Sequence, residues 1–299
     1  MNVLLIRFSA LGDIVLTYPV LKFLSEKVNK VDFITNPMSL DILSIDEIEY
    51  IIFKKEWSFW KKLSFIFRMR KKKYDLIIDL QNNRWSRRII SFSRADNIVV
   101  NEDREDRHAI FNYSDTIKKF FPEFKLQDSY KIPYKTLVEE KLPNIKKPYA
   151  CIFFSSSKRW ISKRPNLYSI EKIIDLLDKR GLSIVQIGDN NDRVVCDERV
   201  FDVTGKLSIR QLKKVLSLSK FLITTDSFPM HLAAFCECPV IALFGPTDPS
   251  RCGPYGKNNI ILYKGINCQP CYNSKCENNI CMNIDIGKIE DAIEKIYHD

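Results

Sequence analysis

Short apolar runs alternate along this chain with longer segments in which apolar residues recur at helical spacing. Near the N-terminus, an apolar run at residues 3–7 leads through a turn into a helical pattern that continues to about Lys27. Short apolar runs between turn residues are typical of buried strands, and the intervening helical patterns indicate βαβ units. The alternation therefore predicts an α/β protein built on parallel sheets.

The pattern occurs twice, with an interruption between the two halves. The segment 139–148 contains two prolines and a run of charged residues, which is typical of a linker. We therefore expect two doubly wound Rossmann-like domains, residues 1–146 and residues 147–299, that face a central cleft. Further strands are predicted at residues 31–35, 51–53, 74–80, 149–154, 183–188, 221–224 and 239–244, and helices of the second half begin near residues 166, 209, 230 and 286.

Three turns that follow expected strands carry polar groups suited to binding a ligand. Asp13 follows the first strand, the basic segment 155–165 follows a later one, and Asp226 with Ser227 follows the strand at 221–224. Ligands of open α/β sheets bind at the carboxyl ends of the strands, where helix N-termini suit phosphate. We expect Asp226 or Ser227 to cap the helix that follows. For Asp13, a simple helix cap is the alternative to a functional role.

Composition narrows the class of protein. The 299 residues carry a net charge of +10, which favours anionic partners such as phosphorylated substrates, nucleic acid or an anionic membrane. No run approaches eighteen apolar residues, and the N-terminus lacks the basic region and cleavage site of a signal peptide, so we expect a cytoplasmic protein. Nine cysteines, an odd number, are then expected to be reduced. The glycines do not follow the G-x-G-x-x-G pattern of dinucleotide-binding proteins.

The positive charge is concentrated between residues 54 and 73, where nine basic residues and one acidic residue are interleaved with aromatic residues. In a helix, this segment places Trp60, Leu63 and Phe67 on one face. A basic amphipathic helix rich in aromatics is typical of a membrane interface. The alternative is a solvated basic face over a stripe that packs in the core.

Four cysteines lie close together in the C-terminal tail. Four thiolates can hold zinc in a tetrahedral site, but their spacing differs from the paired C-x2-C pattern of common zinc sites. Reduced structural thiols are therefore the default interpretation, and a zinc site is the alternative. The residues concerned are Cys268, Cys271, Cys276 and Cys281.

Several strings of residues resemble the motifs of glycosyltransferase family 9, the bacterial ADP-heptose:lipopolysaccharide heptosyltransferases. The string SALGDIVLTYP at residues 9–19 is similar to the family's N-terminal motif, and DSFPMHLAA, PVIALFGPTDP and GPYG within residues 226–256 are similar to its C-terminal signature. One departure lies in this signature, where Phe228 stands in place of the usual glycine. The loop at 155–165 also resembles a family loop, with three serines in place of P-G-A.

The resemblance implies a GT-B architecture with an acceptor-binding N-terminal domain and a nucleotide-sugar-binding C-terminal domain. It implies that Asp13 is the catalytic base and that Lys163 stabilises the donor diphosphate. The segment 81–84 resembles a further family stretch, and arginines there suit acceptor phosphates; they are Arg84, Arg87 and Arg88. The expected donor site contains Ser9, Gly12, Ser157, Lys163, Asp192, Leu207, Asp226, Ser227, Phe228 and His231.

The implied reaction is the inverting transfer of a heptose from ADP-heptose to the lipid A–core precursor of lipopolysaccharide. No D-x-D motif occurs, so we expect catalysis without a divalent metal, and we expect no cofactor. The expected partners are ADP-heptose, the lipid A–core acceptor and the inner face of the cytoplasmic membrane, to which the protein attaches peripherally, but not nucleic acid. Three alternatives stay open: a family 9 transferase with another nucleotide sugar or acceptor, a nucleotide-sugar epimerase of the same architecture, and a noncatalytic protein that binds nucleic acid or zinc.

Overall fold

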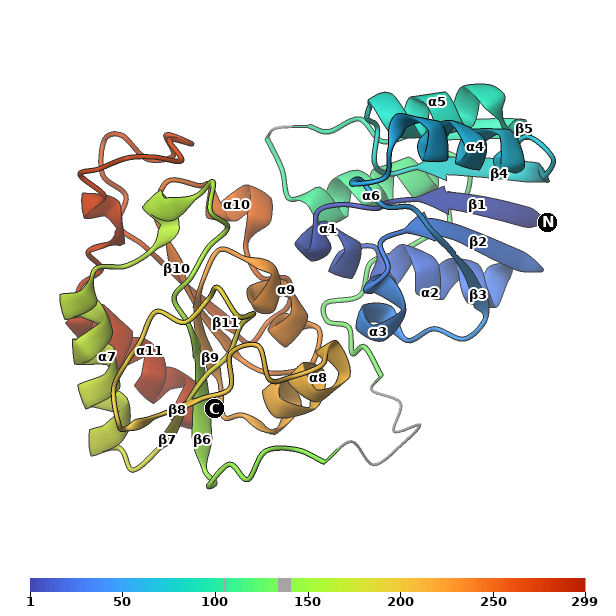
Figure 1. Ribbon diagram of the computed structural model, residues 1–299. Helices are drawn as coiled ribbons and strands as arrows, with labels where there is room; N and C mark the ends of the chain where they lie inside the picture. Colours follow the sequence, from blue (N-terminus) through green and yellow to red (C-terminus); the bar gives the residue numbers. More distant parts are fainter. Residues whose placement is uncertain (105, 134–140, 299) are drawn as a thin grey trace. The chain divides into compact units, whose positions relative to one another are not determined.

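The computed structural model describes residues 1–104, 106–133 and 141–298, which form two compact units, Met1–Gln127 and Asp128–Asp299 (Figure 1). This division falls earlier in the chain than the expected boundary after residue 146. Residues just after the division pack within the second unit, because the Ile132 N–H donates a hydrogen bond of 2.8 Å to the Phe235 carbonyl and the Tyr130 ring stacks on Phe235. The start of the expected linker, residues 139 and 140, lies outside the described residues.

The first unit is a parallel five-stranded sheet in the order β3-β2-β1-β4-β5. Helices α4 and α5 cover one face of this sheet, and α2 and α6 cover the other (Figure 1). The strands are β1 (Asn2–Ile6), β2 (Lys30–Thr35), β3 (Ile48–Ile52), β4 (Lys73–Asp79) and β5 (Arg94–Val100). The helices are α1 (Leu11–Val15), α2 (Tyr18–Lys27), α3 (Ser39–Leu43), α4 (Phe59–Met69), α5 (Arg84–Phe92) and α6 (Ala109–Lys118).

The second unit is a parallel six-stranded sheet in the order β11-β10-β9-β6-β7-β8. Helices α7 and α11 pack together on one face, and α8 and α9 pack together on the other (Figure 1). The strands are β6 (Tyr149–Phe153), β7 (Ser183–Gln186), β8 (Val200–Asp202), β9 (Leu222–Thr225), β10 (Val240–Phe244) and β11 (Asn259–Tyr263). The helices are η1 (Ile161–Lys163), α7 (Leu167–Lys179), α8 (Ile209–Leu218), α9 (Phe228–Ala234), α10 (Pro249–Cys252), η2 (Ile280–Met282) and α11 (Ile286–His298).

Strands β1 and β10 are largely apolar because both of their faces are covered by helices. In β1, the four residues from Val3 to Ile6 are fully buried, and β10 is buried along its whole length. Parallel sheets of this kind produce continuous apolar runs in the sequence. The expected α/β class with two doubly wound units is confirmed.

The helix expected to run unbroken to Lys27 is in fact two helices, so that prediction was wrong. The break lies at Thr17, whose hydroxyl donates a hydrogen bond of 2.6 Å to the Ile14 carbonyl. Pro19 follows in the first turn of α2, where its missing N–H costs nothing because first-turn N–H groups have no partner inside the helix.

Within the described part of the chain, every helix is too short or too polar to cross a lipid bilayer.

Candidate active site

Asp13 lies in the first turn of α1, directly beyond the carboxyl end of β1. Its carboxylate accepts a hydrogen bond of 3.0 Å from the Ala10 N–H and forms an ion pair of 2.5 Å with Arg7. The Tyr113 hydroxyl approaches the second carboxylate oxygen at 3.5 Å. The helix-cap interpretation and the functional one are therefore compatible, because a partly exposed carboxylate is held in one orientation by several donors.

Arg7 and Tyr113 were not singled out from the sequence, although they shape the surroundings of Asp13. The Arg7 guanidinium also donates a hydrogen bond of 2.5 Å to the Leu80 carbonyl and lies 5.3 Å from the centre of the Tyr113 ring. Burial opposes the charge on Arg7, but Tyr113 and Asp13 outweigh burial and raise the pKa of Arg7. Burial raises the pKa of Tyr113 well above its ordinary value, so its hydroxyl stays protonated and donates to Asp13.

The turn after β4 holds the turn after β1 in place. The Gln81 side-chain oxygen accepts hydrogen bonds of 3.0 Å from the N–H groups of both Phe8 and Ser9. Asp79, at the end of β4, in turn accepts the Gln81 and Asn82 N–H groups at 2.9 and 3.0 Å. Burial raises the pKa of Asp79, although these backbone hydrogen bonds oppose the shift. The motif at residues 9–19 is thus fixed from the neighbouring strand.

The three arginines expected to bind the acceptor are all on α5 but differ in their surroundings. Arg84 is exposed at the start of the helix, and Arg87 donates a hydrogen bond of 2.9 Å to the Asn82 side chain. The Arg88 guanidinium lies 4.9 Å from the centre of the Trp85 ring. Arg84 and Arg87 are therefore the two that extend into solvent near the carboxyl end of β4.

In the second unit, the side chain of Asp226 contacts three other side chains at the carboxyl end of β9. The same carboxylate oxygen contacts the Lys163 ammonium at 2.6 Å, the Thr247 hydroxyl at 2.7 Å and the Cys252 thiol at 3.5 Å. The side chains of Lys163 and Asp226 are only 13% and 9% exposed. Burial raises the pKa of Cys252, and the charge on Asp226 adds to that shift, so the thiol is neutral. Thr247 was not expected, because a threonine in a loop carries no signal of its own.

Among the cations of the loop at 155–165, Lys163 is the one that contacts Asp226. Lys158 and Arg159 are exposed, and the Arg164 guanidinium is bound to the Ser156 carbonyl at 2.9 Å. Lys163 also lies 4.7 Å from the centre of the Trp160 ring, which fixes the ammonium on a second side. This arrangement places one cation against the start of the Asp226 motif.

The expected cap of α9 by Asp226 or Ser227 is not formed, so that prediction was wrong. Ser227 occupies the cap position, but its hydroxyl donates a hydrogen bond of 3.1 Å to the Thr225 carbonyl. The Asp226 carboxylate is occupied by Lys163 and Thr247 instead. Phe228 follows as the first residue of α9 and is half-buried, and His231 is buried in the same helix.

The loops that carry the expected donor-site residues Asp192 and Leu207 meet at the edge of the second sheet. The Gly205 N–H donates a hydrogen bond of 2.9 Å to the Gly188 carbonyl. Gly188 has a φ of +142°, and a Cβ there would lie 2.5 Å from the Cβ of Asp192, so only glycine fits. The Asp192 carboxylate accepts the Asp189 N–H at 2.9 Å. Asp192 and Leu207 are partly exposed, whereas Ser157 in the basic loop is exposed.

The four tail cysteines do not form a metal site in the structure. Cys268 and Cys271 are exposed, whereas Cys281 is buried beside Gly245, and burial raises its pKa. Throughout the described ranges, no three His, Cys, Asp or Glu side chains are grouped so that they could hold a metal ion. The nearby thiols of Cys268, Cys271 and Cys276 add to the effect of burial on Cys281, so the four cysteines share one region of the tail, and the zinc alternative stays a prediction.

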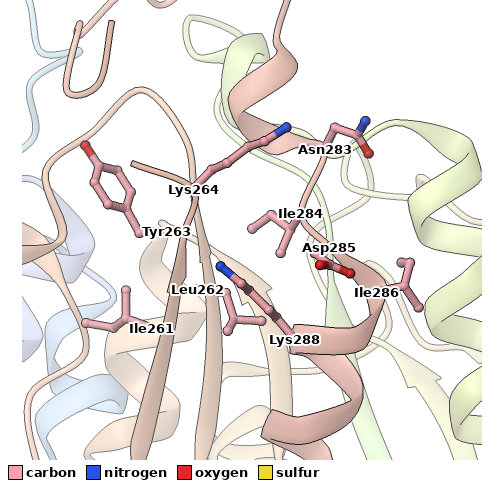
Figure 2. A pocket seen from close by; sticks show the side chains of 9 residues that line it. All are labelled: Ile261, Leu262, Tyr263, Lys264, Asn283, Ile284, Asp285, Ile286 and Lys288. Carbon is pink, nitrogen blue, oxygen red and sulfur yellow. The ribbon is translucent and has the colours of Figure 1, made fainter. Parts of the chain in front are cut away.

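A pocket of about 570 Å³ lies between the end of β11 and the start of α11 (Figure 2). Lys264 and Lys288 line it from the two elements, while the Asp285 carboxylate accepts the Gly287 N–H at 2.9 Å at the start of the helix. None of the expected site residues lines this pocket. We therefore keep the candidate site at Asp13 in the first unit and at Lys163 and Asp226 in the second.

Comparisons with known proteins connect both units to one family. The sequence model of glycosyltransferase family 9 (heptosyltransferase) matches residues 118–281, more than half of the chain. Lipopolysaccharide heptosyltransferase 1 of Pseudomonas aeruginosa is 23% identical over 92% of this chain and 87% of that relative.

Solved structures show the same fold at low sequence identity. Escherichia coli heptosyltransferase WaaC with ADP is 19% identical, with a TM-score of 0.75 over 99% of this chain and all of that one. Escherichia coli ADP-heptose lps heptosyltransferase II is 17% identical, with a TM-score of 0.77 over 99% and 98% of the two chains. The expected GT-B fold class is thereby confirmed. This chain belongs to glycosyltransferase family 9, the heptosyltransferase family.

Proposed function

We propose that this protein transfers a heptose from ADP-heptose to the lipopolysaccharide inner core with inversion at the anomeric carbon. The observation that carries the proposal is the contact of Lys163 with Asp226 at the carboxyl end of β9, inside the segment matched by the family model. The relatives named above act as heptosyltransferases, and one was solved with ADP. The nucleotide-sugar specificity is taken from those relatives.

The donor diphosphate binds beside Lys163 in this proposal. The ammonium is fixed by Asp226 and Trp160, so it is oriented before the donor arrives, and it offsets the charge that develops on the departing ADP. Ser157, Ser227, Phe228 and His231 lie on the same basic loop and at the start of α9. Asp192 and Leu207 lie on the two loops that meet through Gly188 and Gly205, where they suit the nucleoside. This arrangement supplies cationic charge without a divalent metal, which supports metal-independent catalysis.

Asp13 is the general base in this proposal. It takes the proton of an acceptor hydroxyl while the hydroxyl oxygen forms a bond to the anomeric carbon and the bond from that carbon to the ADP oxygen breaks. Arg7 and Tyr113 hold the carboxylate, and Ser9 and Gly12 form the turn around it. Three arginines of α5 are suited to bind phosphates of the lipid A–core acceptor; they are Arg84, Arg87 and Arg88.

An assay of nucleotide release tests the proposal against its alternatives. The protein is incubated with a panel of nucleotide sugars, with and without a lipid A–core acceptor, and the nucleotide diphosphate released is measured with and without a chelator. We expect ADP release from ADP-heptose that depends on the acceptor and is insensitive to the chelator. Acceptor-independent conversion of a nucleotide sugar favours an epimerase, and acceptor-dependent release from another donor favours a different family 9 transferase.

The acceptor also determines where the protein works. Because the lipid A–core precursor is anchored in a membrane, we propose that the protein acts in the cytoplasm, attached peripherally to the inner face of the membrane, without a nucleic-acid partner.

A further inference from the structure

We propose that the outer surface of α4 and α5 binds an anionic lipid bilayer. This α4–α5 surface consists of the aromatic residues Phe59, Trp60, Phe67 and Phe92 and the cations Lys61 and Arg68. The inference rests on the proposed function only because the acceptor there is a lipid.

The inner side of α4 already supplies the core of the first unit. Phe65, Ile66 and Met69 are buried and pack with Ile89 of α5 against the sheet. The stripe that packs in the core is therefore formed by other residues than those that the sequence placed on the amphipathic face. Trp60 and Phe67, which the sequence placed on the amphipathic face, lie on the opposite, outer side and contribute little to the core.

The outer side of the two helices exposes large aromatic rings in contact with one another. Trp60 is 75% exposed, Phe59 53%, Phe67 49% and Phe92 41%. The Phe59 and Trp60 ring centres are 5.6 Å apart, and Phe67 of α4 lies 5.9 Å from Phe92 of α5. Grouped exposed aromatics mark an interaction site rather than the scattered apolar residues of an ordinary surface.

The charge around these aromatic rings indicates that the partner is anionic. The sequences of α4 and α5 contain six cations and no carboxylate. Among the residues that the structure describes, none of the six forms an ion pair; Lys62 and Arg88 instead lie 4.8 and 4.9 Å from the Trp85 ring, one from each helix. Aromatic rings at headgroup depth, flanked by unneutralised cations, fit an anionic bilayer.

The surface adjoins the end of the unit that carries Asp13. Strands β1 and β4 are parallel neighbours, with Ile6 opposite Asp79, so Asp13 and the start of α5 follow strand ends at one edge of the sheet. The ring centre of Phe59 lies 6.4 Å from that of Trp85, which is in the first turn of α5. Phe59 therefore lies near this edge as well. A bilayer bound here brings lipid-anchored acceptors to the edge where the proposed base lies.

Sedimentation of the full chain with vesicles tests the proposal without donor or acceptor. We expect binding to phosphatidylcholine vesicles that contain phosphatidylglycerol, weaker binding to phosphatidylcholine alone, and release by salt. The double variant Lys61→Gln, Arg68→Gln should bind these anionic vesicles about 25-fold more weakly, because the loss of each cation weakens binding about fivefold. The double variant Trp60→Ser, Phe67→Ser should bind the anionic vesicles about tenfold more weakly or worse.

Matched variants on the second unit control for general loss of charge or apolar surface. They are Lys179→Gln with Lys295→Gln, and Leu167→Ser with Tyr168→Ser, all exposed positions. These should change vesicle binding by less than about twofold, and thermal unfolding should show that every variant is folded.

Several outcomes would overturn the proposal. They are equal binding to both kinds of vesicle, no binding to either, and equal losses in the control variants. A dimer that becomes a monomer in Trp60→Ser, Phe67→Ser, without any change in vesicle binding, would assign the surface to a second copy of the chain. Failure here leaves ADP release from a detergent-dispersed acceptor unaffected, so it is distinguishable from failure of the proposed function.

Discussion

At the scale of single residues, the orientation of the Asp13 carboxylate is set by three donors. The Ala10 N–H and Arg7 bind one oxygen, and the Tyr113 hydroxyl approaches the other. A base fixed in this way loses less conformational entropy when the acceptor hydroxyl arrives. Two kinds of substitution therefore test the site. One kind replaces the proposed base, and the other removes a donor that orients its carboxylate.

Replacing Asp13 and Lys163 should affect different steps. Asp13→Asn should lower kcat by about 10²–10⁴-fold and leave ADP affinity nearly unchanged, because the base contacts only the acceptor hydroxyl. Lys163→Ala should weaken ADP binding and slow turnover, because the ammonium meets the diphosphate in both states. Calorimetric ADP titration beside steady-state kinetics measures both effects.

Lys158→Ala is the matched control for this pair, because it removes an exposed cation of the same loop. It should bind ADP as the unchanged protein does. Loss of ADP affinity in Lys158→Ala, with none in Lys163→Ala, would contradict the assignment of the diphosphate to Lys163. Near-normal turnover of Asp13→Asn would show that Asp13 is a helix cap and not the base.

Releasing the carboxylate should slow the reaction without removing the base. Arg7→Gln is expected to lower kcat by about 10–100-fold with ADP affinity unchanged, because Asp13 loses its ion pair and reorients. Arg7→Lys should recover part of this loss, and Tyr113→Phe, which removes only the 3.5 Å contact, should cost less than either. A normal kcat in Arg7→Gln would show that the Ala10 N–H and the Tyr113 hydroxyl are enough to orient the base.

By the family resemblance, Phe228 stands where a glycine is usual at the expected donor site. It is half-buried as the first residue of α9, near the proposed diphosphate position. If its ring narrows that position, Phe228→Gly should tighten ADP-heptose binding or broaden the range of nucleotide sugars accepted. Donor affinities and a donor panel measure this. An unchanged affinity together with an unchanged preference would mean that the ring points away from the donor.

At the scale of elements, a buried carboxylate connects β2 with the start of β4. Asp32 is 2% exposed and accepts hydrogen bonds of 2.7 Å from both Lys72 and the Tyr74 hydroxyl. Burial raises the pKa of Asp32, but these hydrogen bonds and the nearby lysine charges outweigh burial and hold the pKa below its ordinary value. Because the folded-state pKa lies below the unfolded-state value, this carboxylate stabilises the fold at neutral pH.

Asp32→Asn should therefore lower the free energy of unfolding at pH 7 by about 1–3 kcal/mol. The difference between the two proteins should persist down to the unfolded-state pKa of about 3.9 and vanish as the pH falls through the folded-state pKa. Urea unfolding across the acid range measures it. Asp96→Asn, which removes an exposed ion pair with Lys73, should change little at any pH. A pH-independent loss in Asp32→Asn would point to packing rather than charge.

The central strands could be predicted from the sequence, but the sheet edges could not. Strands buried on both faces give continuous apolar runs, as in β1 and β10, whereas β5 is largely exposed and carries no such run. The turns that hold Asp13 and Asp226 could be placed from the apolar runs before them, whereas the expected roles of Asp13 and Lys163 came from the family resemblance. Arg7 and Gln81 were missed because their contacts join segments more than 70 residues apart, which local sequence does not show.

At the scale of the whole molecule, each unit places its proposed chemistry at the carboxyl ends of its own parallel strands. The first unit carries the proposed base, and the second carries the cation proposed for the diphosphate. In the proposed function, the first unit binds the acceptor and the second binds the nucleotide sugar, which is consistent with two repeats of the βα pattern that carry different motifs.

The mass of the acceptor after reaction tests the central claim most directly. The protein is incubated with ADP-heptose and a lipid A–core acceptor that lacks heptose. The molecular mass of the acceptor is then measured by mass spectrometry, and the released ADP is measured in the same sample. The account predicts that the acceptor gains the mass of one heptose residue, in step with one ADP released, and that Asp13→Asn abolishes both. An acceptor of unchanged mass, while the protein consumes another nucleotide sugar or converts ADP-heptose without the acceptor, would contradict it.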